Sequence, residues 1–426
     1  MTIAIFLFSL LGAMMIGMPI AYALIACAVA LMYHLNMMDA QIIAQNFING
    51  ADSFPLMAIP FFMLAGEVMN TGGLSKRIVN VALNMVGHIK GGLGYVAVLA
   101  SCFLAAVSGS AIADAAAVSA LLFPMMAAAG YNKERSAGLI AAANIVGPII
   151  PPSTGFVVFG VIAGVSITKL FLAGIVPGLM VGAAVAIAWA ITVRRENVQP
   201  APRVPFKEVA LSVYRGVWAL VLPLIILFGL KLGVFTPTEA AVVAAVYSLF
   251  VACFIYRELK FSQLYAVFLS AGKTTAVVMF LVAAAMVSAW LIAVAELPDK
   301  IVDLMHPFAG NQTALMFAMM ALVVIVGTAL DMAPTILILT PVLMPIVKDA
   351  GIDPIYFGVL FIINNAIGLI TPPVGTVLNV VSGITKVKMD GLIRGVWPFL
   401  LAQLLVLLAL ILFPQLVTVP AKWFGA

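Results

Sequence analysis

Two short polar motifs lie inside long apolar stretches of this chain. The first is Ser108-Gly109-Ser110, and the second spans Gly327–Asp331. Hydroxyl and backbone carbonyl oxygens are the hard ligands that small cations take in proteins. Both motifs therefore favour the binding of a cation over a covalent reaction.

Each motif has a counterpart further along the chain, where an apolar segment is interrupted. The interruptions share an asparagine, a glycine and a Pro-Pro pair: Asn144, Gly147 and Pro151-Pro152 in one, and Asn365, Gly368 and Pro372-Pro373 in the other. Proline removes a backbone donor and clashes with the preceding turn, so a helix must break at these places. The carbonyl end of a broken helix suits a cation and the amide end suits an anion. This predicts Na⁺ and a carboxylate side by side.

The four segments predict two cation sites flanking one substrate. The ligands of the first Na⁺ are predicted at Ser108, Ser110, Gly147, Ile150 and Pro152. Those of the second are predicted at Gly327, Gly368, Thr371 and Pro373. The predicted substrate contacts are Gly109, Ser153, Thr328, Asp331 and Thr376. An alternative is that the small residues only allow helices to pack closely, as they often do in membranes.

Several polar side chains near these segments are predicted either to support the breaks or to have one of two alternative roles. Asn144 and Asn365 are predicted to support the breaks by bonding freed backbone groups. Asp114 either caps the helix that follows the first motif or contributes to the first cation site. A buried acid costs about 2.5–3.5 kcal/mol in a membrane, so Asp331 is assigned to the substrate or the second tip, or else to capping the next helix. Glu67 is interpreted as structural.

The interrupted segments belong to an internal repeat of 221 residues. Eight structure-setting residues coincide at this offset: Pro124/Pro345, Gly130/Gly351, Asn144/Asn365, Gly147/Gly368, Pro151/Pro372, Pro152/Pro373, Gly174/Gly395 and Pro177/Pro398. Glycine and proline set the backbone shape, so the two halves are predicted to share a fold. Paired apolar segments that are broken at corresponding positions indicate the binding site of a secondary transporter.

The composition predicts an all-α polytopic membrane protein. Hydrophobic residues make up 65% of the chain and charged residues 9%, whereas soluble domains are roughly 45–50% apolar. The basic residues form short clusters between apolar spans, a pattern of membrane orientation and not of nucleic-acid binding. The apolar start, Met1–Tyr33, lacks the features of a signal peptide. No ATPase module, catalytic motif or metal-ligand spacing is evident, which favours an ion-driven transporter without a prosthetic group over an enzyme.

The chain is predicted to consist of two repeats and a linker. Residues 1–193 form the first repeat, with scaffold spans in 1–90, a re-entrant helical hairpin at 91–130 and a discontinuous helix at 137–165. Residues 194–216 form the linker. Residues 217–426 form the second repeat, with scaffold spans in 217–295, a hairpin at 313–347, a discontinuous helix at 356–385 and a last span at 392–416.

Charge bias predicts that the two repeats are inverted. Basic clusters flank the first hairpin and occupy the linker, which places the linker in the cytoplasm and both chain termini in the periplasm. The second hairpin is flanked by a net acidic set that is expected outside: Glu296, Asp299, Asp303, Lys348, Asp349 and Asp353. Opposite charge bias on matching segments is the signature of inverted topology.

Four motifs in this sequence resemble the large membrane subunit of the TRAP transporters, a DctM-like permease. They are Val107-Ser108-Gly109-Ser110, Pro151-Pro152-Ser153, Phe235-Thr236-Pro237-Thr238-Glu239-Ala240 and Thr371-Pro372-Pro373-Val374-Gly375. The resemblance covers nearly the whole chain. It departs at Val107, where relatives often carry Leu, and at Thr154-Gly155, a difference that bears on substrate selection.

The resemblance implies Na⁺-driven uptake of an organic acid, such as sialic acid, a C4-dicarboxylate or a sugar acid, across the bacterial inner membrane. It also implies a small four-span membrane subunit and a periplasmic substrate-binding protein as partners. The hairpins and broken helices would move as one body against a scaffold, in the elevator manner of the ion-transporter superfamily. Two alternatives stay open: a stand-alone Na⁺-coupled carboxylate carrier or antiporter, and a membrane scaffold whose repeats only pack.

Overall fold

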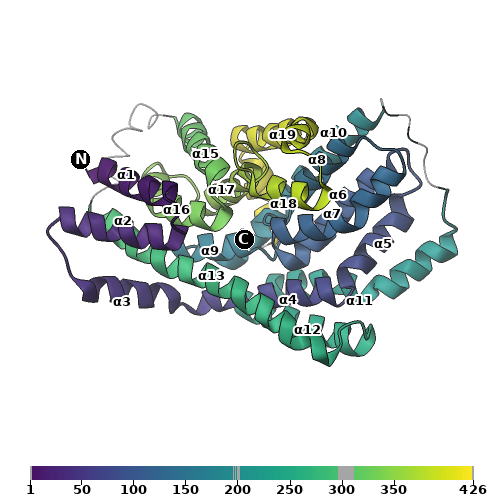
Figure 1. Cartoon of the computed structure of the whole chain (residues 1–426), viewed down its shortest axis with the longest axis horizontal. Helices are drawn as coiled ribbons and strands as arrows, with labels where there is room; N and C mark the ends of the chain where they lie inside the picture. The colour runs from purple at the N-terminus through teal and green to yellow at the C-terminus, as the bar shows by residue number, and fades with distance from the viewer. Residues whose placement is uncertain (1, 195, 197, 199–201, 296–310, 425–426) are drawn as a thin grey trace.

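The computed structural model describes residues 2–194, 196, 198, 202–295 and 311–424. Within it, the first repeat consists of ten α-helices (Figure 1). Five of them precede the first hairpin: α1 (Thr2–Met15), α2 (Ile20–His34), α3 (Ala40–Ala51), α4 (Ala58–Thr71) and α5 (Leu74–Val86). The hairpin is α6 (Gly92–Ser108) and α7 (Ala111–Ala128). The broken helix is α8 (Lys133–Asn144) and α9 (Thr154–Ala163), and α10 (Ile167–Val193) closes the repeat.

The second repeat follows the same order. Its first helices are α11 (Phe206–Lys231), α12 (Pro237–Phe250), which continues as one π turn, and α13 (Phe261–Val294). The second hairpin is α15 (Gln312–Ala329) and α16 (Met332–Asp349), and the second broken helix is α17 (Pro354–Gly368) and α18 (Thr376–Thr385). The chain closes with α19 (Met389–Leu412) and α20 (Gln415–Phe424).

The repeat of 221 residues seen in the sequence extends to whole helices. Helices α6 to α10 match α15 to α19 at this offset, with ends that differ by a few residues. One difference lies before the hairpins, because the single long α13 matches both α3 and α4. Residues 52–57 separate α3 from α4, with a 3₁₀ turn at Phe54–Met57 that contains Pro55, and proline restricts both itself and the residue before it. The matching segment of α13 contains no proline and stays helical.

Local sequence explains where the hairpins turn and where the broken helices resume. Helix α6 ends at Gly109, whose φ of +60° lies in the left-handed region that glycine adopts without strain. The Ser110 Oγ accepts a hydrogen bond from the Ala113 amide and so caps α7. Ser153 caps α9 in the same way, with its Oγ accepting from the Phe156 amide. Both breaks contain a cis bond within their Pro-Pro pair.

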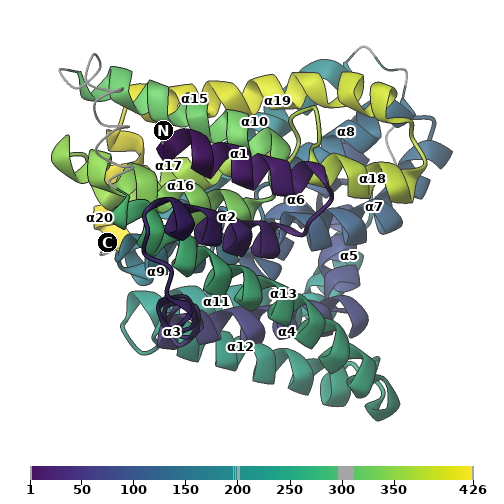
Figure 2. The same cartoon turned by 60° about the vertical axis from the view of Figure 1, so that its left-hand side comes forward.

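The two repeats interlock and build two parts of the molecule together. Helices α3, α4, α12 and α13 run along one edge in Figure 1, and α10, α15 and α19 run along the opposite edge. Figure 2 shows the same division from another side. Contacts between the repeats join both parts, with α12 on α4, α13 on α2 and α3, α8 on α19, α7 on α18 and α9 on α16. Each part is therefore shared by the two repeats.

The helices have the length and composition of a membrane protein. Among the described residues, nine helices are long and apolar enough to cross a bilayer, which needs about 20 apolar residues. The predicted all-α fold with two hairpins and two broken helices is confirmed. Residues 206–216 were predicted as linker but form the start of α11, and the sequence did not predict α20. Glu296, Asp299 and Asp303 lie outside the described residues, and the sidedness of the repeats stays a prediction.

Candidate functional site

The first tip packs directly on the first break, and we name this contact the first junction (108–110 and 145–153). A Cβ added to Gly109 would lie 2.6 Å from the carbonyl oxygen of Pro152, and one added to Gly147 would lie 3.1 Å from the Ala111 amide nitrogen. The structure thus brings Ser108, Ser110, Gly147 and Pro152 together, as the sequence predicts. The Ile150 side chain contacts Gly178 of α10, so its backbone carbonyl is the group left for a ligand.

The second junction is formed by residues 327–331 and 366–374. A Cβ added to Gly368 would lie 2.8 Å from both the carbonyl carbon and the oxygen of Gly327. The Thr371 hydroxyl donates to the Ile367 carbonyl oxygen at 2.8 Å within its own helix turn. The predicted pair Gly327 and Gly368 is in contact, whereas Pro373 is exposed at the rim of the break.

The two asparagines support the junctions in different ways. Asn144 donates to the Ile140 carbonyl oxygen at 2.7 Å and accepts from the Ser101 hydroxyl at 3.0 Å. Asn365 donates to the Met332 carbonyl oxygen at 3.0 Å, which ties the second broken helix to its hairpin. The buried Oδ1 of Asn365 has no hydrogen-bond partner among the described residues. This oxygen lies 3.2 Å from the position that a Cβ added to Gly327 would occupy. An unpaired acceptor therefore faces the second tip.

Two acids mark the starts of the returning hairpin helices. Asp114 is only 1% exposed and its carboxylate lies beside the Ser108 hydroxyl, without a well-formed hydrogen bond to either oxygen. Because Ser110 caps α7, the alternative role of Asp114 as a cap has no support in the geometry. Asp331 stands at the N-cap position of α16, and its Oδ1 is 3.5 Å from the Thr376 hydroxyl. The structure therefore brings the predicted substrate residues Asp331 and Thr376 together.

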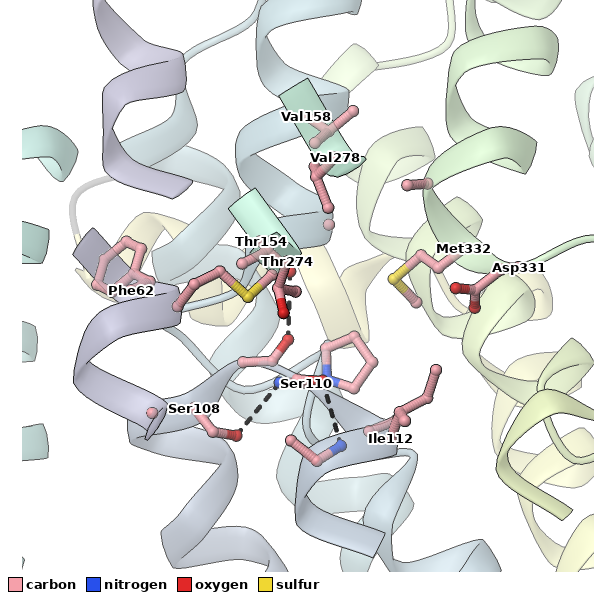
Figure 3. Close-up of a pocket in the computed structure, with 18 of the residues that line it drawn as sticks. Phe62, Ser108, Ser110, Ile112, Thr154, Val158, Thr274, Val278, Asp331 and Met332 are labelled. Carbon is pink, nitrogen blue, oxygen red and sulfur yellow. Dashed lines mark hydrogen bonds between the residues drawn. The ribbon is translucent and has the colours of Figure 1, made fainter. Parts of the chain in front are cut away.

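A cavity of about 340 Å³ lies between the two tips and the helices α4 and α13 (Figure 3). The predicted residues that line it are Ser108, Gly109, Ser110 and Asp331. The starts of α7, α9 and α16 all reach it, through Ala111, Thr154 and Met332 respectively. Helix starts carry free amides and a partial positive charge, so the cavity can hold an anion.

The other predicted substrate residues lie outside the cavity lining. Ser153 is fully buried and its hydroxyl donates to the Pro148 carbonyl oxygen at 2.5 Å. The Thr328 hydroxyl donates to the Ile325 carbonyl oxygen at 2.8 Å within α15. Thr376 reaches the cavity only through Asp331. Their roles as direct substrate contacts stay predictions.

The structure adds polar groups to the cavity that sequence analysis missed. Glu67 and Asn70 contribute from α4, Thr274 from α13 and Thr154 from the start of α9. The sequence interpretation of Glu67 as structural did not place it here. Glu67 and Asn70 lie one helical turn apart, a spacing that could have indicated a shared polar face of α4. Helix α4, however, has no break of the kind that marked the other segments as a site.

A cation at the junctions would have only uncharged oxygens and isolated acids as ligands. No group of three or more His, Cys, Asp or Glu side chains in the described ranges is placed to hold a metal ion. Carbonyl, hydroxyl and amide oxygens at the junctions, together with the unpaired Asn365 Oδ1 and Asp114, are donors of the type that hard cations accept. The two junctions fit a weakly held, exchangeable cation.

Comparison with known proteins agrees with this geometry. The sequence matches the family described as the DctM component of tripartite ATP-independent periplasmic transporters over residues 7–416. It is 55% identical over 425 residues to the 2,3-diketo-L-gulonate TRAP transporter large permease protein of Escherichia coli K12, with 100% of both chains covered. It is 36% identical over 409 residues to the sialic acid TRAP transporter large permease protein of Vibrio cholerae, with 96% of both covered.

A solved structure shares the fold. The YdaH transporter of Alcanivorax borkumensis superposes with a TM-score of 0.65 at 16% identity, covering 91% of this chain and 90% of that one. The family resemblance carried by the motifs at the first tip, at both breaks and at residues 235–240 is confirmed over nearly the whole sequence. This chain therefore belongs to the DctM family, as the large permease subunit of a bacterial TRAP transporter.

Proposed function

We propose that this permease imports an organic acid across the bacterial inner membrane, coupled to the entry of Na⁺. A periplasmic binding protein delivers the acid, and a small membrane subunit of about four spans completes the complex. The family description as tripartite supports both partners. The linker between the repeats lies in the cytoplasm and both termini lie in the periplasm.

One observation carries this proposal: two junctions of the same design flank a single cavity. At each, a hairpin tip packs backbone to backbone on a broken helix. Irregular backbone at bilayer depth is tolerated only where it is buried in protein or lines a wet cavity. The first Na⁺ is assigned to Ser108, Ser110, Gly147, Ile150 and Pro152, and the second to Gly327, Gly368, Thr371 and Pro373.

The division of the molecule supports an elevator mechanism. Residues of both tips and both breaks line the cavity together with residues of α4 and α13. Both repeats contribute to each part of the molecule, so the junctions form one body that can slide against one scaffold. The relatives named for a diketogulonate and a sialic acid support an acid as the cargo.

Uptake by the reconstituted transporter tests the proposal. Proteoliposomes containing this chain and its small subunit are supplied with the cognate binding protein, labelled acid and an inward Na⁺ gradient. Uptake is expected with Na⁺ and is expected to fall to background when K⁺ replaces it. Equal uptake in both salts would contradict Na⁺ coupling. Uptake by this chain alone would instead support a stand-alone carrier.

A further inference from the structure

Helices α5 and α11, one from each repeat, border a polar hollow that shares no residue with the transport cavity. The two helices pack side by side at the right-hand end of Figure 1, and a Cβ added to Gly216 of α11 would lie 2.8 Å from the Val81 side chain of α5. The hollow has a volume of about 630 Å³. Lys76, Asn80 and Asn84 line it from a single face of α5, at intervals of four residues. No step of the proposed transport function uses these polar groups.

Two of the cations in this hollow have no acidic partner. Arg77 is paired with Glu258, at 2.7 Å between Nη1 and Oε1, and its guanidinium carbon lies 3.7 Å from the centre of the Tyr256 ring. Lys76 and Arg215 line the same hollow but form no ion pair with any described residue. The side chain of Arg77 is therefore held in place, and the other two cations are available to an anion.

The charges of the lining favour an anion with one negative charge. Glu208 is the second acid in the lining, and it stands in the first turn of α11, where the positive end of the helix stabilises it. Three cations and two acids leave a net charge of +1. A phosphodiester carries one negative charge and neutralises it. The side-chain amides of Asn80 and Asn84 donate to no described residue, so they add neutral donors for its oxygens.

An aromatic groove of about 290 Å³ adjoins the polar hollow, because the two arginines of the hollow line both. Tyr214, Trp218 and Tyr256 line the rest of it. The Tyr256 hydroxyl donates to the Arg215 carbonyl oxygen at 3.0 Å. The Tyr247 hydroxyl donates to the Trp218 carbonyl oxygen at 2.8 Å, and the two bonds fix the end of α12 against α11. Trp and Tyr are enriched where a membrane meets water, because their rings combine an apolar body with a polar tip.

The place of the site along α11 corresponds to the membrane surface. Arg215 is the last charged residue before the uncharged, mostly apolar stretch 216–230, within a helix that is long and apolar enough to cross a bilayer. A phosphate beside Arg215 would therefore have its acyl chains level with the apolar stretch. The aromatic groove would cover the first part of one chain, whereas a soluble anion would leave the groove empty.

We propose that this site binds one anionic phospholipid, with its phosphate between Lys76 and Arg215 and one acyl chain along Trp218 and Tyr256. The lipid bridges the two repeats, since α5 belongs to the first and α11 to the second. Helix α11 directly follows the linker, so with the linker in the cytoplasm the lipid belongs to the inner leaflet. Basic pockets between helices on that side are suited to acidic lipid headgroups. The proposal does not depend on the identity of the transported acid or on Na⁺ coupling.

Lipid retention by the purified complex of large and small subunits tests the proposal. The complex is stripped of lipid in detergent, and phosphatidylglycerol, phosphatidylethanolamine or glycerophosphoglycerol, the headgroup without acyl chains, is added back. Native mass spectrometry counts the bound molecules, and the unfolding temperature reports their effect. One phosphatidylglycerol is expected to bind at concentrations at least about fivefold below those for phosphatidylethanolamine, because the lining has a net positive charge. Glycerophosphoglycerol is expected not to bind.

Variants of the site separate the headgroup from the chain. Lys76→Gln and Arg215→Gln are each expected to weaken phosphatidylglycerol binding about fivefold, and the double variant is expected to lose it. Trp218→Ala should weaken binding without a change of charge. Lys207→Gln is the matched control, because it removes one cation from the exposed first turn of α11, outside both hollows. It should bind the lipid normally. Unfolding temperatures without lipid show that each variant is folded before it is compared.

Several outcomes would overturn the proposal. Normal binding by the Lys76→Gln/Arg215→Gln double variant would place the lipid elsewhere, and an equal loss in Lys207→Gln would show that binding follows the overall charge. Equal binding of phosphatidylethanolamine would exclude an anionic headgroup as the requirement. Binding of glycerophosphoglycerol as tightly as the lipid would assign the hollow to a soluble anion. A complex that binds no phosphatidylglycerol would show that the small subunit covers this face. None of these outcomes bears on Na⁺-coupled uptake.

Discussion

Every residue of the first break, 145–153, is buried, whereas Pro373 and Val374 in the second break are exposed, Val374 by 40%. The equivalent asparagines differ too. Both the Oδ1 and the Nδ2 of Asn144 have a hydrogen-bond partner within the first repeat, whereas the Oδ1 of Asn365 has none among the described residues. The first junction is closed and the second is open on one side.

The cause lies in what the last long helix of each repeat packs against. Gly174 of α10 faces its own break, since an added Cβ would lie 2.8 Å from the Ile149 carbonyl oxygen. Gly395 is its equivalent in α19, but it packs on α8 of the other repeat, where an added Cβ would overlap the Glu134 carbonyl oxygen. Helix α10 therefore covers the first break, while α19 leaves the second uncovered. The shared Asn, Gly and Pro-Pro residues produced similar breaks in unequal surroundings.

The largest effect is expected from Gly395→Ala. Its new methyl group would meet only backbone atoms of Glu134 and Arg135, which cannot rotate away. We therefore expect the free energy of unfolding to fall by about 3 kcal/mol, the upper end of typical overpacking. Gly174→Ala meets a Phe156 ring as well as the Ile149 carbonyl, and should cost about 1–2 kcal/mol. Unfolding temperatures in detergent measure the difference. Gly383→Ala, with open space around it, is the control; equal losses in both glycine variants would remove the proposed cause of the asymmetry.

The two junction glycines should differ in their effect on transport. Gly368→Ala places a Cβ 2.8 Å from the Gly327 carbonyl, and Gly147→Ala places one at 3.1 Å from its nearest atoms. Contacts under 3.0 Å force the tip off the break, so Gly368→Ala is expected to abolish Na⁺-dependent uptake. Gly147→Ala is expected to reduce uptake by about tenfold, for a strain near 1.4 kcal/mol. Initial rates in proteoliposomes, normalised to folded protein, test this order. Normal uptake by Gly368→Ala would contradict a site at the second junction.

Alanine at the two asparagines should separate stability from ion binding. Asn144→Ala loses its bond to Ile140 and its share of the single Ser101 hydroxyl proton, a cost of about 1–2 kcal/mol, while Ser101 still donates to Ala97. It should lower the unfolding temperature and leave the Na⁺ dependence unchanged.

Asn365→Ala loses one bond and the free acceptor. It should raise the Na⁺ concentration for half-maximal uptake several-fold, with a smaller loss of stability. A shift in Na⁺ dependence for Asn144→Ala alone would reverse this assignment.

The smallest functional effect is expected from cysteines at the equivalent positions Val374 and Ser153. Val374 is 40% exposed and Ser153 is fully buried. In a background without Cys27, Cys102 and Cys253, a water-soluble maleimide should label Val374→Cys and leave Ser153→Cys nearly unmodified, with transport by Val374→Cys close to normal. Similar labelling rates would show that the second break is no more open than the first.

Much of the site was predictable because tips and breaks are local features. Gly109, Ser110 and the Pro-Pro pairs act on backbone within a few residues, through steric exclusion and capping. Their repetition at a constant offset predicted the paired hairpins and broken helices. The contact of each tip with its own break followed from the same pairing.

The sequence alone determined where the helices break and that the halves are equivalent, because proline and glycine limit the backbone wherever they occur. Tertiary structure alone decided that Glu67, Asn70 and Thr274 complete the cavity, and that α10 covers a break while α19 does not. These features depend on contacts between segments hundreds of residues apart, such as Gly395 on Glu134. Such contacts arise from the close packing of whole helices, and a local pattern does not encode them.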